Sequence, residues 1–196
     1  MHDLDDPLPP GHARLLFARH GATAPNLAGL RCGGDLDPPL AEEGRRQAMN
    51  LARIVAARAP DLDLIVCSDL VRTRETAAIV RAALGPIELR LMPGFRERRL
   101  GRWNLRPITD TEAAMAAGET PPGGESRAAF SRRIHEALQL LAPALDRRVL
   151  LVASKGVGRV LREIAGMPPS APLRNAELLD LRFAPAPCPV HREVIA

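Results

Sequence analysis

Three short apolar segments of the chain each give way, within five residues, to a side chain that is positively charged or can become so. The segments and these side chains are ARLLFA (13–18) with Arg19 and His20, DLIVC (63–67) with Arg72, and VLLVA (149–153) with Lys155. Guanidinium groups match phosphate oxygens two at a time, and an ammonium group adds a point charge. If the three segment ends meet in space, these side chains repel one another unless an anion neutralises them. The pattern therefore indicates an oxyanion site.

Arg72 lies near the start of a predicted helix over 70–84. The helix dipole disfavours positive charge in the first turn, so helix stability does not explain this residue. A bound anion would explain it, but so would a solvated arginine that pairs with Glu75 or Asp69. The sequence alone leaves both interpretations open.

His20 has a setting that the other histidines lack. It is flanked by Arg19 and by Gly21, which lets a ligand approach the backbone closely. The remaining histidines lie near the termini, before a strand, or in a helix: His2, His12, His135 and His191. No spacing typical of a metal site occurs, so we expect neither a metal nor another cofactor. A histidine after a strand can also be a purely structural group.

The elements that would position these residues alternate along the chain. Helical spacing of apolar residues predicts helices over 42–58, 70–84, 109–117 and 157–166, and another around 130–141 after the breaker PPGG (121–124). Strands are predicted at 13–18, 63–67, 87–91, 149–153, 177–183 and 189–195. This alternation predicts a three-layer α/β/α fold with a mostly parallel sheet covered on both faces. In such sheets ligands bind beyond the carboxyl ends of the strands, where the cations lie.

Length and composition limit the class of protein. The chain has 196 residues, 46% of them hydrophobic, which suits a single domain over 13–196 behind a disordered leader at 1–12. The acidic, proline-rich start does not resemble a signal peptide and no segment approaches the length of a membrane span, so we expect a cytoplasmic protein without a membrane partner. A net charge of +4 favours anionic partners, but only 3% of residues are aromatic, which argues against nucleic acid. The three cysteines form no C-x-x-C pair, and the oligomeric state is not predicted.

Six segments, in order, resemble the histidine phosphatase superfamily, whose fold is called phosphoglycerate-mutase-like. They are LLFARHGATAPN (15–26), RCGGDLDPPLAEEGRRQA (31–48), SDLVRTRETA (68–77), FRERRLGRW (95–103), PGGES (122–126) and RNAEL (174–178). The second segment is most similar to the α-ribazole-phosphatase-like branch. The resemblance implies a phosphatase that acts on a small phosphorylated metabolite, or that binds inorganic phosphate.

The resemblance also implies roles for individual residues. His20 would be the nucleophile that takes the phosphoryl group, and Glu97 would exchange protons with the leaving group and with water. Phosphate oxygens would be bound by Arg19, Asn26, Arg72, Lys155 and Gly156. Thr23 and Arg31 would contact substrate. Arg31 and Arg102 would either bind a second anionic group or be merely solvated. Glu97 also has a structural alternative, as an exposed partner of Arg96, Arg98 or Arg99.

Lys155 departs from the family pattern. The family reads S-H-G after this strand, whereas this chain reads Ser154-Lys155-Gly156, and Lys155 is its only lysine. Lysine keeps positive charge and donor capacity but loses the rigid geometry of imidazole. Lys155 would therefore either support turnover, or disable it and leave a protein that binds phosphorylated ligands without hydrolysing them. Lys155 could also pair with Glu97, which would make the site structural and inert. A phosphomutase ranks third, because only about twenty residues separate the Glu97 loop from PGGES. The substrate stays unidentified, because 22–41 and 104–121 carry few distinctive groups and Trp103 suits a pocket wall or the core equally well.

Overall fold

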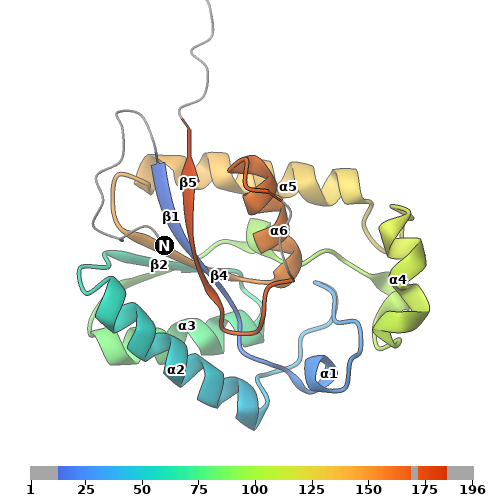
Figure 1. Ribbon diagram of the computed structural model, residues 1–196, viewed down its shortest axis with the longest axis horizontal. Coiled ribbons are helices and arrows are strands. Elements are labelled where there is room, and N and C mark those ends of the chain that lie inside the picture. The colour runs from blue at the N-terminus through green and yellow to red at the C-terminus, as the bar shows by residue number, and fades with distance from the viewer. Residues whose placement is uncertain (1–12, 169–171, 185–196) are drawn as a thin grey trace, which may run out of the picture.

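The computed structural model describes residues 13–168 and 172–184, and it places a five-stranded sheet at the centre of the molecule (Figure 1). The strand order is β3-β2-β4-β1-β5, and the strands are β1 (Ala13–Arg19), β2 (Leu64–Cys67), β3 (Glu88–Leu91), β4 (Val149–Ala153) and β5 (Leu178–Phe183). Only β5 runs antiparallel to its neighbour; the other pairs are parallel. This confirms the predicted α/β fold with a mostly parallel sheet.

Helices cover both faces of the sheet. They are α1 (Ala24–Leu27), α2 (Glu42–Arg58), α3 (Val71–Leu84), α4 (Ile108–Ala116), α5 (Arg127–Leu141) and α6 (Lys155–Ile164). Helices α2 and α3 lie on one face, α5 and α6 lie on the other, and α4 stands away from the sheet (Figure 1). Single turns of 3₁₀ helix occupy Pro93–Phe95, Gly101–Trp103 and Ala142–Ala144.

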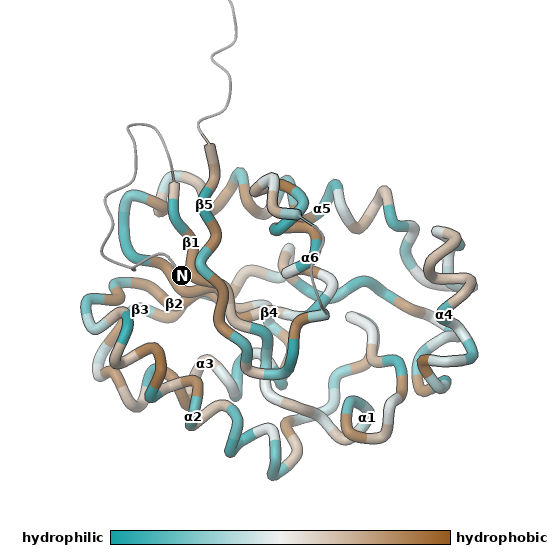
Figure 2. The backbone as a smooth tube through the Cα atoms, in the orientation of Figure 1, coloured by the Kyte–Doolittle hydropathy of each residue, from teal (hydrophilic) through white to brown (hydrophobic). Residues whose placement is uncertain are grey.

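The core consists of two apolar clusters separated by the sheet. Because side chains alternate along a strand, Leu15 and Phe17 of β1 pack with α5 and α6, whereas Leu16 and Ala18 pack with α2 and α3. The central strands β2 and β4 are buried along their whole length, so they are apolar throughout, as Figure 2 shows. Trp103 is 7% exposed and belongs to the buried residues of the loop after β3.

The register of the sheet brings the carboxyl ends of β1, β4 and β2 together. Arg19 pairs with Ala153, and Cys67 pairs with Val152. The His20 amide then donates to the Ala153 carbonyl at 2.9 Å, which holds the first residue after β1 against the end of β4. Segments that are far apart in the sequence therefore deliver their cations to the same edge of the sheet.

Helix α6 begins two residues earlier than the sequence pattern predicted. Gly156 and Gly158 weaken the sequence signal for a helix at this point, because glycine is unfavourable in helix interiors. Both are required by close packing: a Cβ on Gly158 would lie 2.6 Å from the Phe17 ring, and one on Gly156 would overlap the Glu97 carboxylate. Lys155 consequently lies in the first turn of α6 and not in a loop before it.

Within the described residues, the other predicted strands and helices lie close to the observed ones, and α5 begins at Arg127 where a start around residue 130 was predicted. The short helix α1 falls in a stretch expected to be irregular. The predicted leader at 1–12 and edge strand at 189–195 lie outside the described residues. Across the part of the chain that the structure describes, no helix has the length and apolar character to cross a membrane.

Candidate active site

His20 lies directly after β1 and is only 4% exposed. Its Nδ1 atom is 2.7 Å from the Gly21 carbonyl oxygen. Because a carbonyl can only accept, this contact requires a hydrogen on Nδ1 and, in the neutral ring, leaves the lone pair on Nε2. Burial, Arg72 and Arg19 all lower the pKa of His20 well below 6.5. The site therefore holds a neutral imidazole whose Nε2 can act as a nucleophile.

Arg19 and Arg72 carry positive charge beside this ring. Arg19 donates to the Leu173 carbonyl at 2.7 Å. Arg72, 1% exposed, donates to the carbonyls of Leu36 at 2.7 Å and Gly33 at 3.1 Å. Both Nε atoms are buried without a hydrogen-bond partner among the described residues. Carbonyls orient the two guanidinium groups but do not neutralise them.

The contacts of Arg72 test whether it is a solvated arginine paired with Glu75 or Asp69. It pairs with neither Glu75 nor Asp69, because these carboxylates bind Arg45 and Arg96. Asp37 is 4.0 Å from Arg72. Its carboxylate accepts a hydrogen bond from the Val71 amide at 2.8 Å, at the start of α3. A solvated surface arginine is thereby ruled out.

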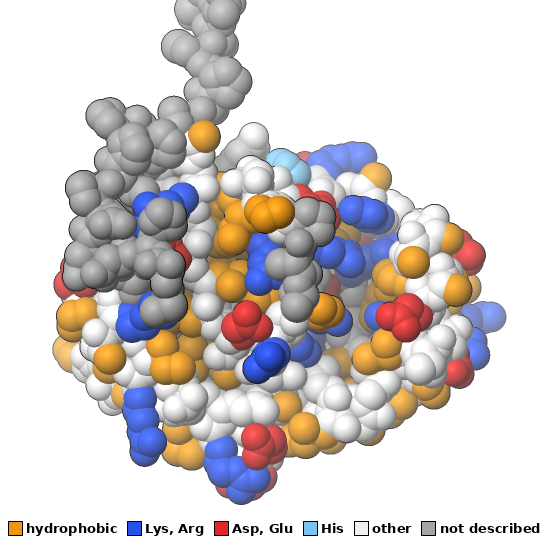
Figure 3. Space-filling model, viewed as in Figure 1, with side chains coloured by type: hydrophobic (Ala, Val, Ile, Leu, Met, Phe, Trp, Pro, Cys, Tyr) orange, Lys and Arg blue, Asp and Glu red, His pale blue; other side chains and the backbone are white. Residues whose placement is uncertain are grey.

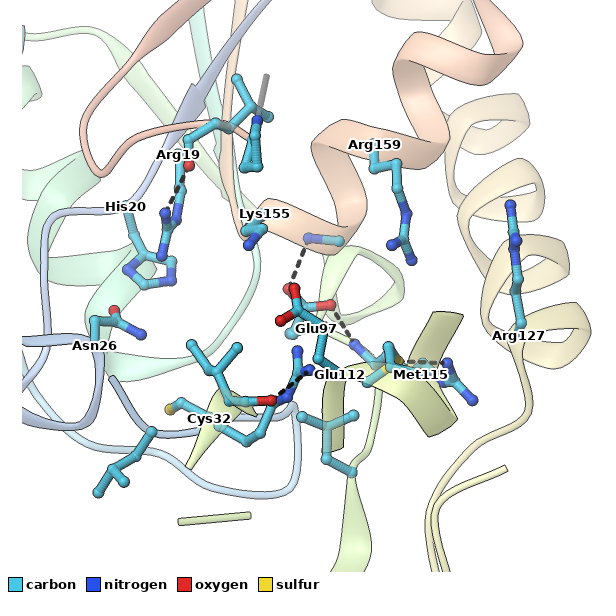
Figure 4. Close-up of a pocket in the computed structure, with 18 of the residues that line it drawn as sticks. Arg19, His20, Asn26, Cys32, Glu97, Glu112, Met115, Arg127, Lys155 and Arg159 are labelled. Carbon is cyan, nitrogen blue, oxygen red and sulfur yellow. Dashed lines mark hydrogen bonds between the residues drawn. The ribbon is translucent and has the colours of Figure 1, made fainter. Parts of the chain in front are cut away.

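Glu97 is held at the start of α6. Its Oε1 accepts the Arg98 amide at 2.7 Å, and its Oε2 accepts the Gly156 amide at 2.8 Å, as the dashed lines in Figure 4 show. No described arginine forms an ion pair with Glu97; Arg96 binds Asp69, and the Arg98 guanidinium donates to the Glu125 and Glu119 carbonyls. The alternative of a surface glutamate paired with a neighbouring arginine is therefore wrong.

A buried ion pair supports the loop that carries Glu97. Arg133 of α5 binds the Glu125 carboxylate at 2.8 Å, where Glu125 is 6% exposed. The same guanidinium donates to the carbonyls of Gly94 at 2.8 Å, Arg96 at 2.9 Å and Glu97 at 3.3 Å. These contacts fix the backbone on both sides of Glu97, so its carboxylate is placed by the fold.

Lys155 is exposed in the cavity that His20 lines, between Arg19 and Glu97 (Figure 4). Partial burial and the charges of Arg19 and Arg31 lower the pKa of its ammonium group. Within 13–168 and 172–184, no hydrogen bond or ion pair engages its Nζ, so the predicted Lys155–Glu97 pairing is absent there. The amine remains available to a ligand.

The cavity has a volume of about 440 Å³ and collects most of the predicted site residues. Those that line it are Arg19, His20, Asn26, Arg31, Glu97, Lys155 and Gly156. Arg72 and Thr23 do not line it: Arg72 is buried close enough to His20 to lower its pKa, and Thr23 is fully buried with its backbone amide 3.2 Å from the Asn26 Oδ1. Arg102 lies outside the lining.

The lining also contains residues that the sequence analysis did not single out. They are chiefly Arg159 of α6, Arg127 of α5, Cys32, and the apolar side chains Leu30, Ile108, Met115 and Leu173. Burial raises the pKa of the Cys32 thiol, so this cysteine is not activated as a nucleophile. Among the described residues, no group of three or more His, Cys, Asp or Glu side chains could hold a metal ion.

A buried neutral imidazole, two arginines that backbone carbonyls orient, and a fixed carboxylate meet at one edge of the sheet, an arrangement that suits a phosphoryl-like anion. The family model of the histidine phosphatase superfamily (branch 1) matches residues 15–192, and the chain belongs to this superfamily. The predicted superfamily is thereby confirmed, whereas the α-ribazole-phosphatase-like branch stays a prediction.

Known relatives include both phosphatases and mutases. The chain is 33% identical to the "Probable phosphoglycerate mutase GpmB" of Yersinia enterocolitica over 190 residues, which covers 89% of this chain and 86% of that protein. Among solved structures, it is similar to mycobacterial glucosyl-3-phosphoglycerate phosphatase in complex with VO3, with 29% identity, a TM-score of 0.73 and coverage of 86% of this chain and 90% of the other. The α-ribazole phosphatase of Shigella flexneri is 29% identical with a TM-score of 0.67, covering 79% and 81% of the two chains.

Proposed function

We propose that this protein is a phosphomonoester hydrolase that acts through a phosphohistidine intermediate on a small phosphorylated metabolite. The observation that carries the proposal is the state of His20, a neutral ring that lines the cationic cavity, with Nδ1–H bound to the Gly21 carbonyl and the lone pair therefore on Nε2. The lowered pKa keeps this nitrogen unprotonated at neutral pH, so it does not need a separate base.

The reaction has two steps, phosphoryl transfer to His20 and hydrolysis of the phosphohistidine. In the first, Nε2 of His20 attacks phosphorus, the bond from phosphorus to the ester oxygen breaks, and the leaving oxygen takes a proton from the Glu97 carboxyl group. In the second, water attacks the phosphohistidine while the Glu97 carboxylate accepts a proton from that water. The P–N bond then breaks, its electron pair returns to Nε2, and inorganic phosphate leaves.

Charged donors stabilise the phosphoryl group in both steps. Arg19 lines the cavity beside His20, and Arg72, buried outside the lining, adds positive charge close to the ring. Asn26 adds an amide and Gly156 permits close approach at the start of α6. Lys155 takes the place of the second histidine of the family, where a donor strengthens its contact as negative charge develops. Its open position in the same cavity supports this role.

The test is phosphate release from p-nitrophenyl phosphate and other small esters. We expect His20→Ala to abolish release, and the exposed His135→Ala on α5 to retain it. Equal rates for the wild type and His20→Ala would remove the proposed nucleophile.

Lys155 itself favours a second candidate, a binder of phosphorylated ligands with impaired turnover. Removal of a preorganised transition-state donor costs roughly 10²–10³ in rate, and a flexible ammonium replaces only part of it. A silent wild type together with an active Lys155→His variant would establish the binder. Transfer of phosphate between two positions of one substrate, without release, would instead favour the mutase named among the relatives.

A further inference from the structure

The cavity carries more positive charge than one phosphoryl group requires. Seven of the residues that line it are arginine or lysine, and two are glutamate. Lys and Arg side chains gather in the hollow of the face that Figure 3 shows. Arg98 and Arg127 are already engaged, by backbone carbonyls and by Glu163 respectively. Arg162 lines the cavity as well and already has an interaction partner, which leaves Arg31 and Arg159 beside Arg19 and Lys155.

Arg159 lies one helical turn after Lys155 on the same face of α6. Both side chains extend from α6 into the cavity (Figure 4). Like charges four residues apart on a helix repel each other. Within the described ranges, Arg159 forms no hydrogen bond or ion pair, and its charge instead lowers the pKa values of Lys155, Arg31 and Arg98. Helix stability alone would not favour an arginine here.

Arg31 approaches the same space from another segment and is fixed in position. Its Nε donates to the Thr111 hydroxyl at 2.8 Å, and its Nη2 lies 3.4 Å from the Ile108 carbonyl. Thr111 is 3% exposed, so this hydrogen bond attaches Arg31 to a buried position of α4. No described carboxylate lies within salt-bridge distance of Arg31, although Glu112 and Glu97 are near enough to influence its pKa. A fixed guanidinium and an unpaired one thus line the same cavity, near enough for the charge of Arg159 to lower the pKa of Arg31.

We propose that Arg31 and Arg159 bind a second anionic group of the substrate, a carboxylate or a second phosphate, while His20, Arg19 and Lys155 hold the phosphoryl group. This inference rests on the proposed function, since it assigns a substrate class to the same site. The volume of about 440 Å³ exceeds what a phosphate group alone fills and leaves room for a short organic linker. Leu30, Ile108 and Met115 supply an apolar wall for that linker.

The kinetic test uses esters that differ only in the second anion. One pair is 3-phosphoglycerate and glycerol 3-phosphate; the other is propane-1,3-diol bisphosphate and 3-hydroxypropyl phosphate. We expect kcat/KM to favour the doubly anionic member of at least one pair by about 10- to 100-fold, as charge-assisted hydrogen bonds allow. Whichever pair shows the preference identifies the second group.

Variants then assign that preference to residues. We expect Arg159→Gln and Arg31→Gln to bring the ratio within about threefold of unity and Arg159→Lys to retain part of it. Arg53→Gln, an exposed arginine of α2 outside the lining, serves as the control and retains the full ratio. A ratio near one for both pairs in the wild type, or a full ratio in both glutamine variants, would overturn the proposal.

An equilibrium measurement separates this inference from the proposed hydrolysis. Calorimetric titration of His20→Ala with the same four esters needs no turnover. A preference for the doubly anionic ligands that is lost in His20→Ala/Arg159→Gln supports the second subsite even if no ester is hydrolysed. Equal affinities within each pair would reject it, whatever the hydrolysis assay shows.

Discussion

At the scale of single residues, the state of His20 decides what the site can do. A ring that is 4% exposed, next to two arginines, and bonded through Nδ1 to a carbonyl stays neutral and presents Nε2. Burial of His20 also makes protein stability depend on pH. The imidazole takes up a proton readily in the unfolded chain, whereas burial and the two arginines oppose its protonation in the folded protein.

The first prediction concerns protein stability against pH. The folded pKa of His20 is lowered below the unfolded value of 6.5, so below about pH 6.5 only the unfolded state takes up this proton. The free energy of unfolding should therefore fall with decreasing pH, with His20 contributing up to about 1.4 kcal/mol per pH unit. Urea titrations between about pH 7.5 and 5 in phosphate-free buffer should show a shallower slope for His20→Gln. A slope unchanged in His20→Gln but reduced in His135→Gln would contradict the assignment.

Lys155 gives a second prediction, on the pH dependence of activity. An imidazolium in this place would titrate near pH ~6.5, whereas the ammonium, with its pKa lowered from 10.5, loses its proton in a more alkaline range. We expect Lys155→His to introduce a decline of kcat/KM above about pH 6.5 that the wild type lacks. Superimposable profiles, measured with one ester from pH 5 to about 9, would count against a transition-state role for this side chain.

At the scale of elements, the start of α6 and the Glu97 loop form one unit. The Glu97 carboxylate accepts the Gly156 amide, and Arg133 holds the backbone of the loop from α5. Alanine normally improves a helix by about 0.8–1 kcal/mol relative to glycine. At position 156, however, the added Cβ would overlap Glu97.

The third prediction follows from this contact. Gly156→Ala should displace the carboxylate and lower kcat by at least about tenfold, because a proton donor must lie within hydrogen-bond reach. It should also destabilise the fold, despite the better helix propensity. In a Glu97→Ala background the same substitution should be neutral or stabilising, since the overlap is gone. Chemical denaturation of the four proteins of this cycle measures the coupling, and additive effects would refute it.

The sequence was sufficient to predict the elements and part of the site. Alternating and helical spacing placed the strands and most helices, because these patterns reflect burial on a sheet or one helix face. The sequence pattern placed the start of α6 two residues too late. Gly156 and Gly158 are there because of close tertiary packing, which helix propensity does not reflect. Arg159 was overlooked for the same reason: its place on the Lys155 face depends on where α6 begins. The Thr111 anchor of Arg31 joins segments eighty residues apart and left no local signal.

At the scale of the whole molecule, the sheet concentrates positive charge at one edge. The net charge is only +4, yet seven basic side chains face a single cavity. Charge focused in a hollow attracts anions over a distance comparable to the Debye length.

The fourth prediction is therefore a strong dependence of activity on ionic strength. The value of kcat/KM should fall by at least about threefold between roughly 20 mM and 200 mM salt, because screening shortens the reach of the cavity's field. Potassium acetate and potassium chloride should act alike if screening is the cause. No change in either salt would contradict the electrostatic account.

The central claim is that Nε2 of His20 receives the phosphoryl group. The most direct measurement is rapid quenching of the enzyme during turnover of a phosphate ester, followed by peptide mass spectrometry under alkaline conditions that preserve phosphohistidine. The account predicts a phosphoryl adduct on the peptide that contains His20, absent from His20→Ala. Turnover with no adduct on His20, or with the adduct on another residue, would contradict it.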